Sequence, residues 1–364
     1  MASVGFIFGV LLLCANLFTP SSCNGHASPG RLPENHQALF IFGDSLFDPG
    51  NNNYINCGIS NQANFTPYGE TFFNYPTVRF CDGRLVPDFI AEFAKLPLIP
   101  AFLLPGLNEF TNGVNFASGG AGALVETHPG TINLEMQLSY FLKVAKSLRE
   151  ELGDAEAKKL LMRAVYLFSI GGNDYHNVNS STPQSYKRQY VGMVIGNITT
   201  ALREIYEVGG RKFGFQNAGP LGCLPAGLKQ SNGDCVQEKS AVGKLHNIAL
   251  SKALQKLEGQ LQGFKYSIFD YYTSLYLLTN YPSKYGFKQG KIACCGSGPY
   301  RGVNSCGGKR GVKQYHLCSN TSEHVWFDFA HTTETANRHL AQLMWSGPPE
   351  VTAPYNVKAL FEML

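Results

Sequence analysis

Short apolar runs recur along the chain, and each is closely followed by Gly, Asn or Asp. Such runs have the usual length of a strand that is buried on both faces. They cover residues 39–42, 114–116, 164–170, 212–216 and 265–269. The pattern therefore predicts five strands.

Longer segments between these runs carry apolar residues at helical spacing. The predicted buried faces of three such helices are Leu134, Leu138, Phe141, Leu142, Ala145 and Leu148; Tyr190, Val194, Ile198, Leu202 and Ile205; and Val242, Leu245, Ile248, Ala249, Leu254 and Leu257. Apolar strands that alternate with amphipathic helices indicate an α/β fold with a parallel sheet covered on both faces. In such folds, ligands bind beyond the carboxyl ends of the strands.

The N-terminal segment differs from the rest, because residues 1–30 contain no Asp, Glu, Lys or Arg and residues 6–18 are almost wholly apolar. Small residues follow, up to Cys23. This is the outline of a secretory signal peptide, and the run is too short to span a bilayer. A membrane anchor is the alternative interpretation. We expect a signal peptide over 1–25, one domain over 26–364, and no stable membrane anchor.

Ten cysteines are present, and eight of them follow the predicted leader. An even number of Cys in an exported chain favours disulfides. Zinc is the alternative for the last four Cys, although they show no Cys-x-x-Cys spacing. We expect a local Cys223–Cys235 bridge and a Cys57–Cys81 pair. We also expect one or two bridges among Cys294, Cys295, Cys306 and Cys318, with the two adjacent residues unpaired with each other.

Four Asn-x-Ser/Thr triplets predict N-glycosylation on the secretory route, at Asn64, Asn179, Asn197 and Asn320. The net charge of +4 on 364 residues is mild, and the basic residues are scattered. We therefore expect no nucleic-acid partner.

The first predicted strand leads into Gly43-Asp44-Ser45 and then a loop rich in Gly and Asn. Ser45 is either a turn residue or a nucleophile held at the end of a strand. A serine hydroxyl becomes a good nucleophile only when a base removes its proton, and an imidazole oriented by a carboxylate does this well. Asp328 and His331 are three residues apart at a predicted loop-to-helix junction, so the carboxylate can reach the imidazole.

Two further strings follow the second and third runs: "GVNFASGGAG" (113–122) and "SIGGNDY" (169–175). Glycines after a strand let backbone N–H groups approach a ligand, and Asn173 adds an amide donor. Each string alone is also typical of an ordinary turn. Together with Ser45 and with Asp328 and His331, they favour acyl chemistry.

These blocks resemble the plant GDSL esterase/lipase family, a branch of the SGNH hydrolases. The strings "FGDSLFDPGNN", "GVNFASGGAGAL", "IGGND", "GPLGC", "KYGF" and "ACCGSG" match that family in order, from about Ala38 to Tyr355. The resemblance implies one doubly wound, flavodoxin-like α/β/α domain with about five parallel strands flanked by helices. It also implies an open site. The α/β-hydrolase scaffold is disfavoured, because Phe47 stands where its elbow needs a second Gly.

The resemblance assigns roles by position. Ser45 corresponds to the nucleophile, His331 to the general base and Asp328 to the acid that orients it. Gly119 and Asn173 correspond to oxyanion-hole donors together with the Ser45 N–H, although Gly120 is adjacent and leaves the register open by one residue. Asp44 corresponds to a residue that supports the loop. No metal and no organic cofactor are implied.

Residues 76–84 depart from the family pattern. Relatives commonly have Gly where this chain has Val78, and Ser where it has Cys81. A β-branched residue adopts positive φ with difficulty, so we expect this loop to differ from that of the relatives.

The expected function is a secreted, extracellular serine esterase or lipase, in the apoplast or cell wall, that hydrolyses small acyl esters through an acyl-enzyme. An acyltransferase that passes the acyl group to an alcohol would use the same residues. A non-catalytic binding protein on this fold is the third hypothesis, and the loss of a catalytic residue would be its signature.

Overall fold

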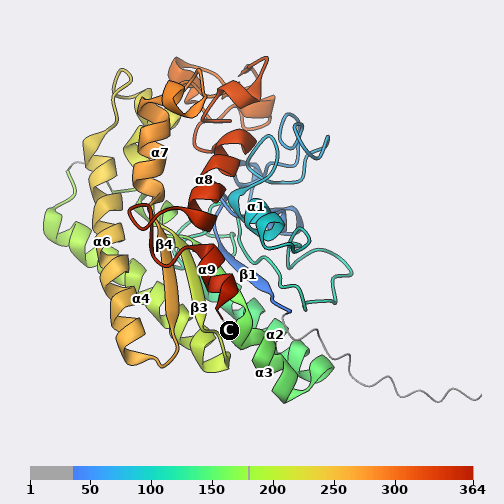
Figure 1. Ribbon diagram of the computed structural model, residues 1–364. Coiled ribbons are helices and arrows are strands. Elements are labelled where there is room, and N and C mark those ends of the chain that lie inside the picture. Colours follow the sequence, from blue (N-terminus) through green and yellow to red (C-terminus); the bar gives the residue numbers. More distant parts are fainter. Residues whose placement is uncertain (1–35, 179–180, 364) are drawn as a thin grey trace, which may run out of the picture.

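Figure 1 shows the computed structural model, which describes residues 36–178 and 181–363. The predicted signal peptide lies outside these residues. Four parallel strands make up most of the sheet: β1 (Leu39–Gly43), β2 (Val165–Ser169), β3 (Lys212–Gln216) and β4 (Lys265–Phe269). The short β7 (Thr352–Pro354) pairs antiparallel with β4, and the strand order is β1-β2-β3-β4-β7. The predicted α/β fold with helices on a largely parallel sheet is confirmed.

The predicted strand at 114–116 lies beside β1 but forms only isolated bridges, one of them between Ile41 and Asn115. The Ile41 N–H donates to the Val114 carbonyl at 3.1 Å, and the Phe116 N–H donates to the Ile41 carbonyl at 2.8 Å. The segment thus occupies the parallel position next to β1. The fifth strand of the sheet is instead β7, which has no long apolar run to predict it.

Helices cover both faces of the sheet, and Figure 1 shows α8 and α9 in front of the strands. One core cluster joins the sheet to α2, α3, α4 and α6, and the other joins it to α1, α7, α8 and α9. The helices are α1 (Val86–Phe93), α2 (Leu134–Leu152), α3 (Asp154–Arg163), α4 (Gln184–Val208), α5 (Pro225–Leu228), α6 (Gln237–Gln260), α7 (Tyr271–Asn280), α8 (Glu334–Ser346) and α9 (Val357–Glu362). Within 36–178 and 181–363, no helix has the length and apolar character needed to cross a membrane.

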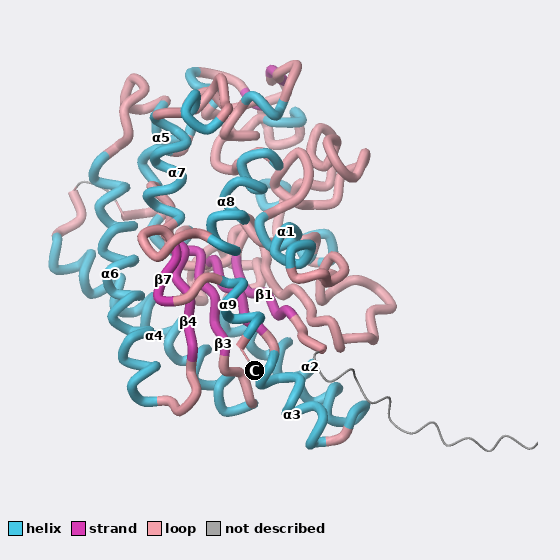
Figure 2. Tube along the Cα trace, viewed as in Figure 1, coloured by secondary structure: helices cyan, strands magenta, loops and turns pink. Residues whose placement is uncertain are grey.

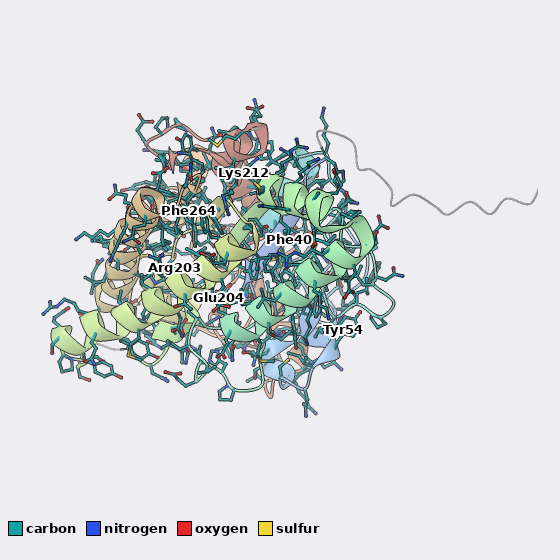
Figure 3. The ribbon with its side chains drawn as sticks, turned by 90° about the horizontal axis from the view of Figure 1, so that it is seen from below. Phe40, Tyr54, Arg203, Glu204, Lys212 and Phe264 are labelled. Atoms are coloured by element: carbon teal, nitrogen blue, oxygen red, sulfur yellow. A yellow bond between two sulfur atoms is a disulfide. The ribbon has the colours of Figure 1, made fainter. Side chains whose placement is uncertain are left out.

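The larger core cluster is aromatic. Phe40 of β1 stacks on Tyr166 of β2, with ring centroids 5.4 Å apart, and Tyr166 stacks in turn on Phe213 of β3. Figure 3 labels Phe40 and Phe264, both of which belong to this cluster. Because these strands are apolar on both faces, helices on either side can bury them.

Two residues on the predicted helix faces were wrongly predicted to be buried. Leu142 is 36% exposed and Ile248 is 55% exposed. The buried stripe of α6 runs through Val242, His246 and Leu250 at intervals of four residues, so Ile248 falls on the outer face. Periodicity identified the helix, but a polar His246 in the stripe concealed its orientation.

Three disulfides are present: Cys223–Cys235, Cys294–Cys318 and Cys295–Cys306. The first confirms the predicted local bridge, and the other two use all four of the last cysteines, which sets the zinc alternative aside. The last two bridges also hold the small hairpin of β5 (Cys295–Gly296) and β6 (His316–Leu317).

The predicted Cys57–Cys81 pair is wrong, because both residues are free and buried. The Cys57 Sγ lies 3.6 Å from the Asn61 carbonyl, whereas the Cys81 Sγ lies 3.3 Å from Asn337 Nδ2 of α8. The two thiols are therefore packed in different surroundings.

Val78 adopts the conformation that glycine would favour, with a φ of 71° and no exposed surface. Residue 78 therefore has a left-handed backbone conformation in spite of its β-branched side chain. L-residues in this region cost roughly 1–2 kcal/mol. Burial of the side chain offsets part of that cost.

We expect Val78→Gly to be more stable than Val78→Ala by about 1 kcal/mol, because glycine alone is free of the left-handed strain. Urea unfolding of both variants, with the disulfides intact, measures the difference. Val144, buried inside α2, is the control. There the order should reverse, since glycine costs about 1 kcal/mol relative to alanine within a helix. If Val78→Ala proved more stable than Val78→Gly, the backbone strain inferred at this position would be contradicted.

Candidate active site

Ser45 lies just past the carboxyl end of β1, in a turn whose neighbours hold it in place. Gln137 of α2 binds the strand end, since its Oε1 accepts from the Gly43 N–H at 2.9 Å and its Nε2 donates to the Gly43 carbonyl at 2.8 Å. Asp44 Oδ1 accepts from the Leu46 N–H at 3.0 Å, so this carboxyl group supports the turn. Figure 2 shows loops and short helices gathered beyond this end of the sheet.

The loop that carries His331 folds back on itself directly before α8. The Phe327 N–H donates to the His331 carbonyl at 2.7 Å, and Asp328 Oδ1 accepts from the N–H groups of Ala330 and His331. The Thr333 side chain then caps the first turn of α8. This tight turn explains why a spacing of three residues is enough to bring the carboxylate against the imidazole.

Ser45, His331 and Asp328 form one hydrogen-bonded series. His331 Nε2 lies 2.8 Å from Ser45 Oγ, and His331 Nδ1 lies 2.8 Å from Asp328 Oδ1. The imidazole is 7% exposed and packs on the Phe80 ring, with centroids 4.8 Å apart. The geometry suits transfer of the serine proton to the imidazole.

Two buried aspartates of this site have opposite electrostatic surroundings. Burial raises the pKa of Asp44 to about 7, although the Leu46 N–H and His331 partly oppose it. Burial also raises the pKa of Asp328, but the charge and hydrogen bond of His331, the charge of Arg310 and the Tyr68 hydroxyl bring it down to about 2. Asp328 is therefore an anion at neutral pH, as a carboxylate that orients a histidine must be.

Gly119, predicted as an oxyanion donor, is engaged elsewhere. Its N–H donates to Asp48 Oδ2 at 2.8 Å. Gly120, in contrast, lines the same cavity as Ser45 and has a φ of 84°. The geometry therefore favours Gly120, the other register that the sequence left open.

Asn173 also lines this cavity, at the end of the loop after β2. Its Nδ2 donates to the Ala121 carbonyl at 2.9 Å, and a primary amide has a second N–H to offer. The structure thus brings Ser45, Gly120 and Asn173 to one cavity. A donor set of this kind can stabilise negative charge on a carbonyl oxygen.

Two further buried aspartates hold the glycine-rich loop in place. Asp48 accepts from the Gly119 N–H and from two N–H groups of its own turn. Asp174 accepts from two N–H groups and a hydroxyl within residues 123–127. Both lie inside the strings that carry the family resemblance, yet sequence reasoning gave them no role. A signal was available only for the local contacts, since Asp48 precedes a Pro-Gly-Asn turn whose N–H groups an Asp side chain readily accepts.

The cavity beside Ser45 and His331 has a volume of about 560 Å³. This falls within the usual range for small-molecule sites. Its lining is mixed, with apolar side chains such as Ile170, Val242 and Leu275 and polar ones such as Asn61 and Asn217. No three His, Cys, Asp or Glu side chains gather into a metal site within the part of the chain that the structure describes.

Three of the predicted glycosylation sites, Asn64, Asn197 and Asn320, are not part of this cavity lining. Asn64 and Asn320 are exposed, and Asn197 is exposed on α4, where its Nδ2 donates to the Ala123 carbonyl. Asn179 lies outside the described residues.

The fold and the Ser–His–Asp contact define an α/β protein of the hydrolase class. A family model described as GDSL-like Lipase/Acylhydrolase matches residues 39–344, and the chain belongs to this family. The match runs from β1 into α8, and it includes the four parallel strands and all three members of the hydrogen-bonded series.

Curated relatives agree with this assignment. The chain is 53% identical to GDSL esterase/lipase 2 of Arabidopsis thaliana, covering 91% of each protein. It is 48% identical to GDSL lipase of Tanacetum cinerariifolium, over 99% of this chain and 94% of that protein. A more distant relative, at 36% identity over 89% of this chain and 74% of its own length, is named Inactive GDSL esterase/lipase-like protein 25, from Arabidopsis thaliana. The protein is a carboxylester hydrolase of the esterase/lipase type.

Proposed function

We propose that the protein hydrolyses small acyl esters through an acyl-enzyme on Ser45. The hydrogen-bonded series of Ser45, His331 and Asp328 beside the cavity is the observation that carries the proposal. One relative is named inactive, so family membership alone does not establish catalysis. The intact series favours an active enzyme over a non-catalytic binding protein.

In the proposed mechanism, Ser45 Oγ attacks the ester carbonyl carbon while His331 Nε2 takes the serine proton. The N–H groups of Ser45 and Gly120 and the Asn173 amide stabilise the oxyanion. The imidazolium then gives its proton to the leaving alcohol, and the acyl group stays on Ser45. Water, deprotonated by His331, releases the carboxylic acid and restores the serine. Asp328 keeps the imidazole in the required tautomer.

An alcohol can replace water in the second half of this reaction, and the protein would then act as an acyltransferase. Polar side chains in the cavity lining, such as Asn61 and Asn217, offer hydrogen bonds for an alcohol. Incubation with a panel of acyl esters, with and without alcohol acceptors, measures how the acyl-enzyme divides between the two.

Export through the secretory route is part of the proposal. Three disulfides favour an oxidising compartment, and the sequons at Asn64 and Asn320 are exposed. The apolar leader over residues 1–25 supplies the signal. The extracellular space, apoplast or cell wall, is the expected destination.

Ser45→Ala should lower kcat by about 10⁶-fold, as loss of a nucleophilic serine does in other hydrolases, and should leave folding unchanged. Ester hydrolysis and the thermal midpoint measure the two effects, and a fluorophosphonate probe should label Ser45 in the parent only. Ser60→Ala, at another serine of the cavity lining, is the matched control and should stay active. Retention of most activity by Ser45→Ala would overturn the mechanism.

Asn173→Ala should lower kcat by about 10²–10³-fold with little change in KM, because it removes an oxyanion donor used in the transition state. Asn173→Asp, which is nearly isosteric, should be at least as damaging because its negative charge faces the developing oxyanion. Steady-state kinetics separate kcat from KM. A large rise in KM at unchanged kcat would move Asn173 from catalysis to substrate binding.

The exported protein should begin near residues 24–26 and should lose mass on treatment with an N-glycosidase. Expression in a secreting host, followed by N-terminal sequencing and mass spectrometry, tests both. Asn64→Gln and Asn320→Gln should each remove one glycan. Retention of the full leader in the mature protein would contradict the predicted signal peptide.

A further inference from the structure

Tyr68 contacts the side of Asp328 that faces away from His331. The Tyr68 hydroxyl lies 2.6 Å from Asp328 Oδ2, while Asp328 Oδ1 binds the His331 imidazole. Both Tyr68 and Asp328 have no exposed surface. Tyr68 comes from the loop before α1, 260 residues before Asp328 in the chain, so the contact is a product of the fold.

Arg310 contacts the same hydroxyl from the other side, with its Nη1 2.7 Å from the Tyr68 oxygen. The guanidinium also lies over the Phe65 and Tyr68 rings, with its central carbon 5.0 and 5.1 Å from their centroids. It donates further to Asn304 Oδ1 at 3.1 Å and to the Gln62 carbonyl. The arginine is therefore fixed in position, with only part of its surface exposed.

The direction of these hydrogen bonds follows from the donors. A guanidinium can only donate, so the Tyr68 oxygen accepts from Arg310 and its single proton must go to Asp328. A hydroxyl that accepts from a cation becomes a stronger donor to an anion. Arg310 thus donates to Tyr68, and Tyr68 donates to Asp328. Asp328 in turn contacts His331, which contacts Ser45.

We propose that Tyr68 and Arg310 are positioning residues that hold Asp328 as an oriented anion and limit the basicity of His331. The inference rests on the proposed function, because it assigns His331 as the base. Tyr68 fixes the plane of the carboxylate and withdraws negative charge from it. Arg310 adds a positive charge behind it, and this opposes protonation of the imidazole.

The loop that carries Arg310 is itself tied down by covalent bonds. It lies between Cys306 and Cys318, which are bridged to the adjacent Cys295 and Cys294. The Cys295 N–H donates to the Phe327 carbonyl at 2.6 Å, one residue before Asp328. The disulfide-held segment therefore contacts the hydrogen-bonded series in two ways, through the backbone next to Asp328 and through Arg310.

Other titratable and charged groups lie near His331 on the elements packed around the cavity. Asp44 approaches the imidazole from the β1 loop, with a pKa that burial raises to about 7. Glu334, three residues after His331, pairs with Arg84 at 2.7 Å and its N–H donates to Asp82. Further basic groups line the same cavity: His128, His176, Lys229 and Lys239. The effect of a change at Tyr68 or Arg310 must therefore be measured on the imidazole itself, since Asp44 is a second titratable group beside it.

Tyr68→Phe should lower kcat by about 10- to 100-fold, the effect of one charge-assisted hydrogen bond, with KM nearly unchanged. The acidic limb of kcat/KM should move to higher pH by about half a unit or more, because the uncompensated Asp328 charge stabilises the imidazolium. Arg310→Gln should move the limb in the same direction, and Arg310→Lys should restore most of the shift. Asp328→Asn removes the anion, so its residual activity should show the limb at lower pH.

Two matched controls separate this role from general packing. Tyr166→Phe removes a buried hydroxyl that donates to the Leu161 carbonyl at 2.9 Å, and Arg301→Gln removes a guanidinium that donates to the Ala293 and Cys294 carbonyls. Both should leave the pH profile unchanged. The His331 ring is followed by NMR titration of ¹⁵N-histidine-labelled protein in the Ser45→Ala background, which needs no activity. Its titration should move upward in Tyr68→Phe and Arg310→Gln.

The outcomes are distinguishable. An active Ser45→Ala variant would defeat the proposed function. An inactive Ser45→Ala, combined with unchanged pH profiles and unchanged His331 titration in folded Tyr68→Phe and Arg310→Gln, would overturn only the positioning role. If Tyr68→Phe fails to fold, Arg310→Gln and Arg310→Lys decide the question, because Arg310 is only partly buried. A shift to lower pH in Arg310→Gln would also overturn it.

Discussion

The site depends on one contact, the hydrogen bond between Ser45 Oγ and His331 Nε2, which joins residues 286 positions apart. Neither residue belongs to a strand or a helix, so secondary structure alone cannot hold them. Both are instead held by hydrogen bonds from neighbouring side chains to their loops. Gln137 fixes the backbone before Ser45, and Asp328 closes the turn before His331.

Buried carboxyl groups accept many of the hydrogen bonds that hold these loops, and the electrostatic surroundings of the carboxyl groups differ. Asp48 and Asp174 accept from N–H groups of the glycine-rich segment, and burial raises the pKa of each. Neutral donors satisfy these groups without fully offsetting desolvation. Asp328 is also fully buried, but the charges of His331 and Arg310 bring its pKa down to about 2. Asp48 and Asp174 thus hold loops, while Asp328 also binds the His331 imidazole.

Four of the five predicted strands are present in the sheet, because strand formation depends on local patterns, and the structure brings Ser45, His331 and Asp328 into contact. Strands β3 and β4 have the predicted bounds, and the motif strings mark the strand ends. Other predictions were wrong where the outcome depended on residues that are far apart in the sequence. Ile248 follows the helical period but is exposed on the outer face of α6. Cys57 and Cys81 do not pair, because they lie in different surroundings in the fold. The Gly119 N–H is taken by Asp48, a competition that no spacing reveals.

By itself, the sequence determined the alternation of strands and helices, the family, and a set of candidate residues for acyl chemistry. These follow from short-range periodicity and from chemical types at fixed spacing. Only the tertiary structure decided which glycine faces the cavity, which cysteines pair, and that Tyr68 and Arg310 lie behind Asp328. The physical reason is that hydrogen bonds and disulfides require distances of a few ångströms between groups that are far apart in the chain. Such distances are fixed by packing of the whole sheet and its loops.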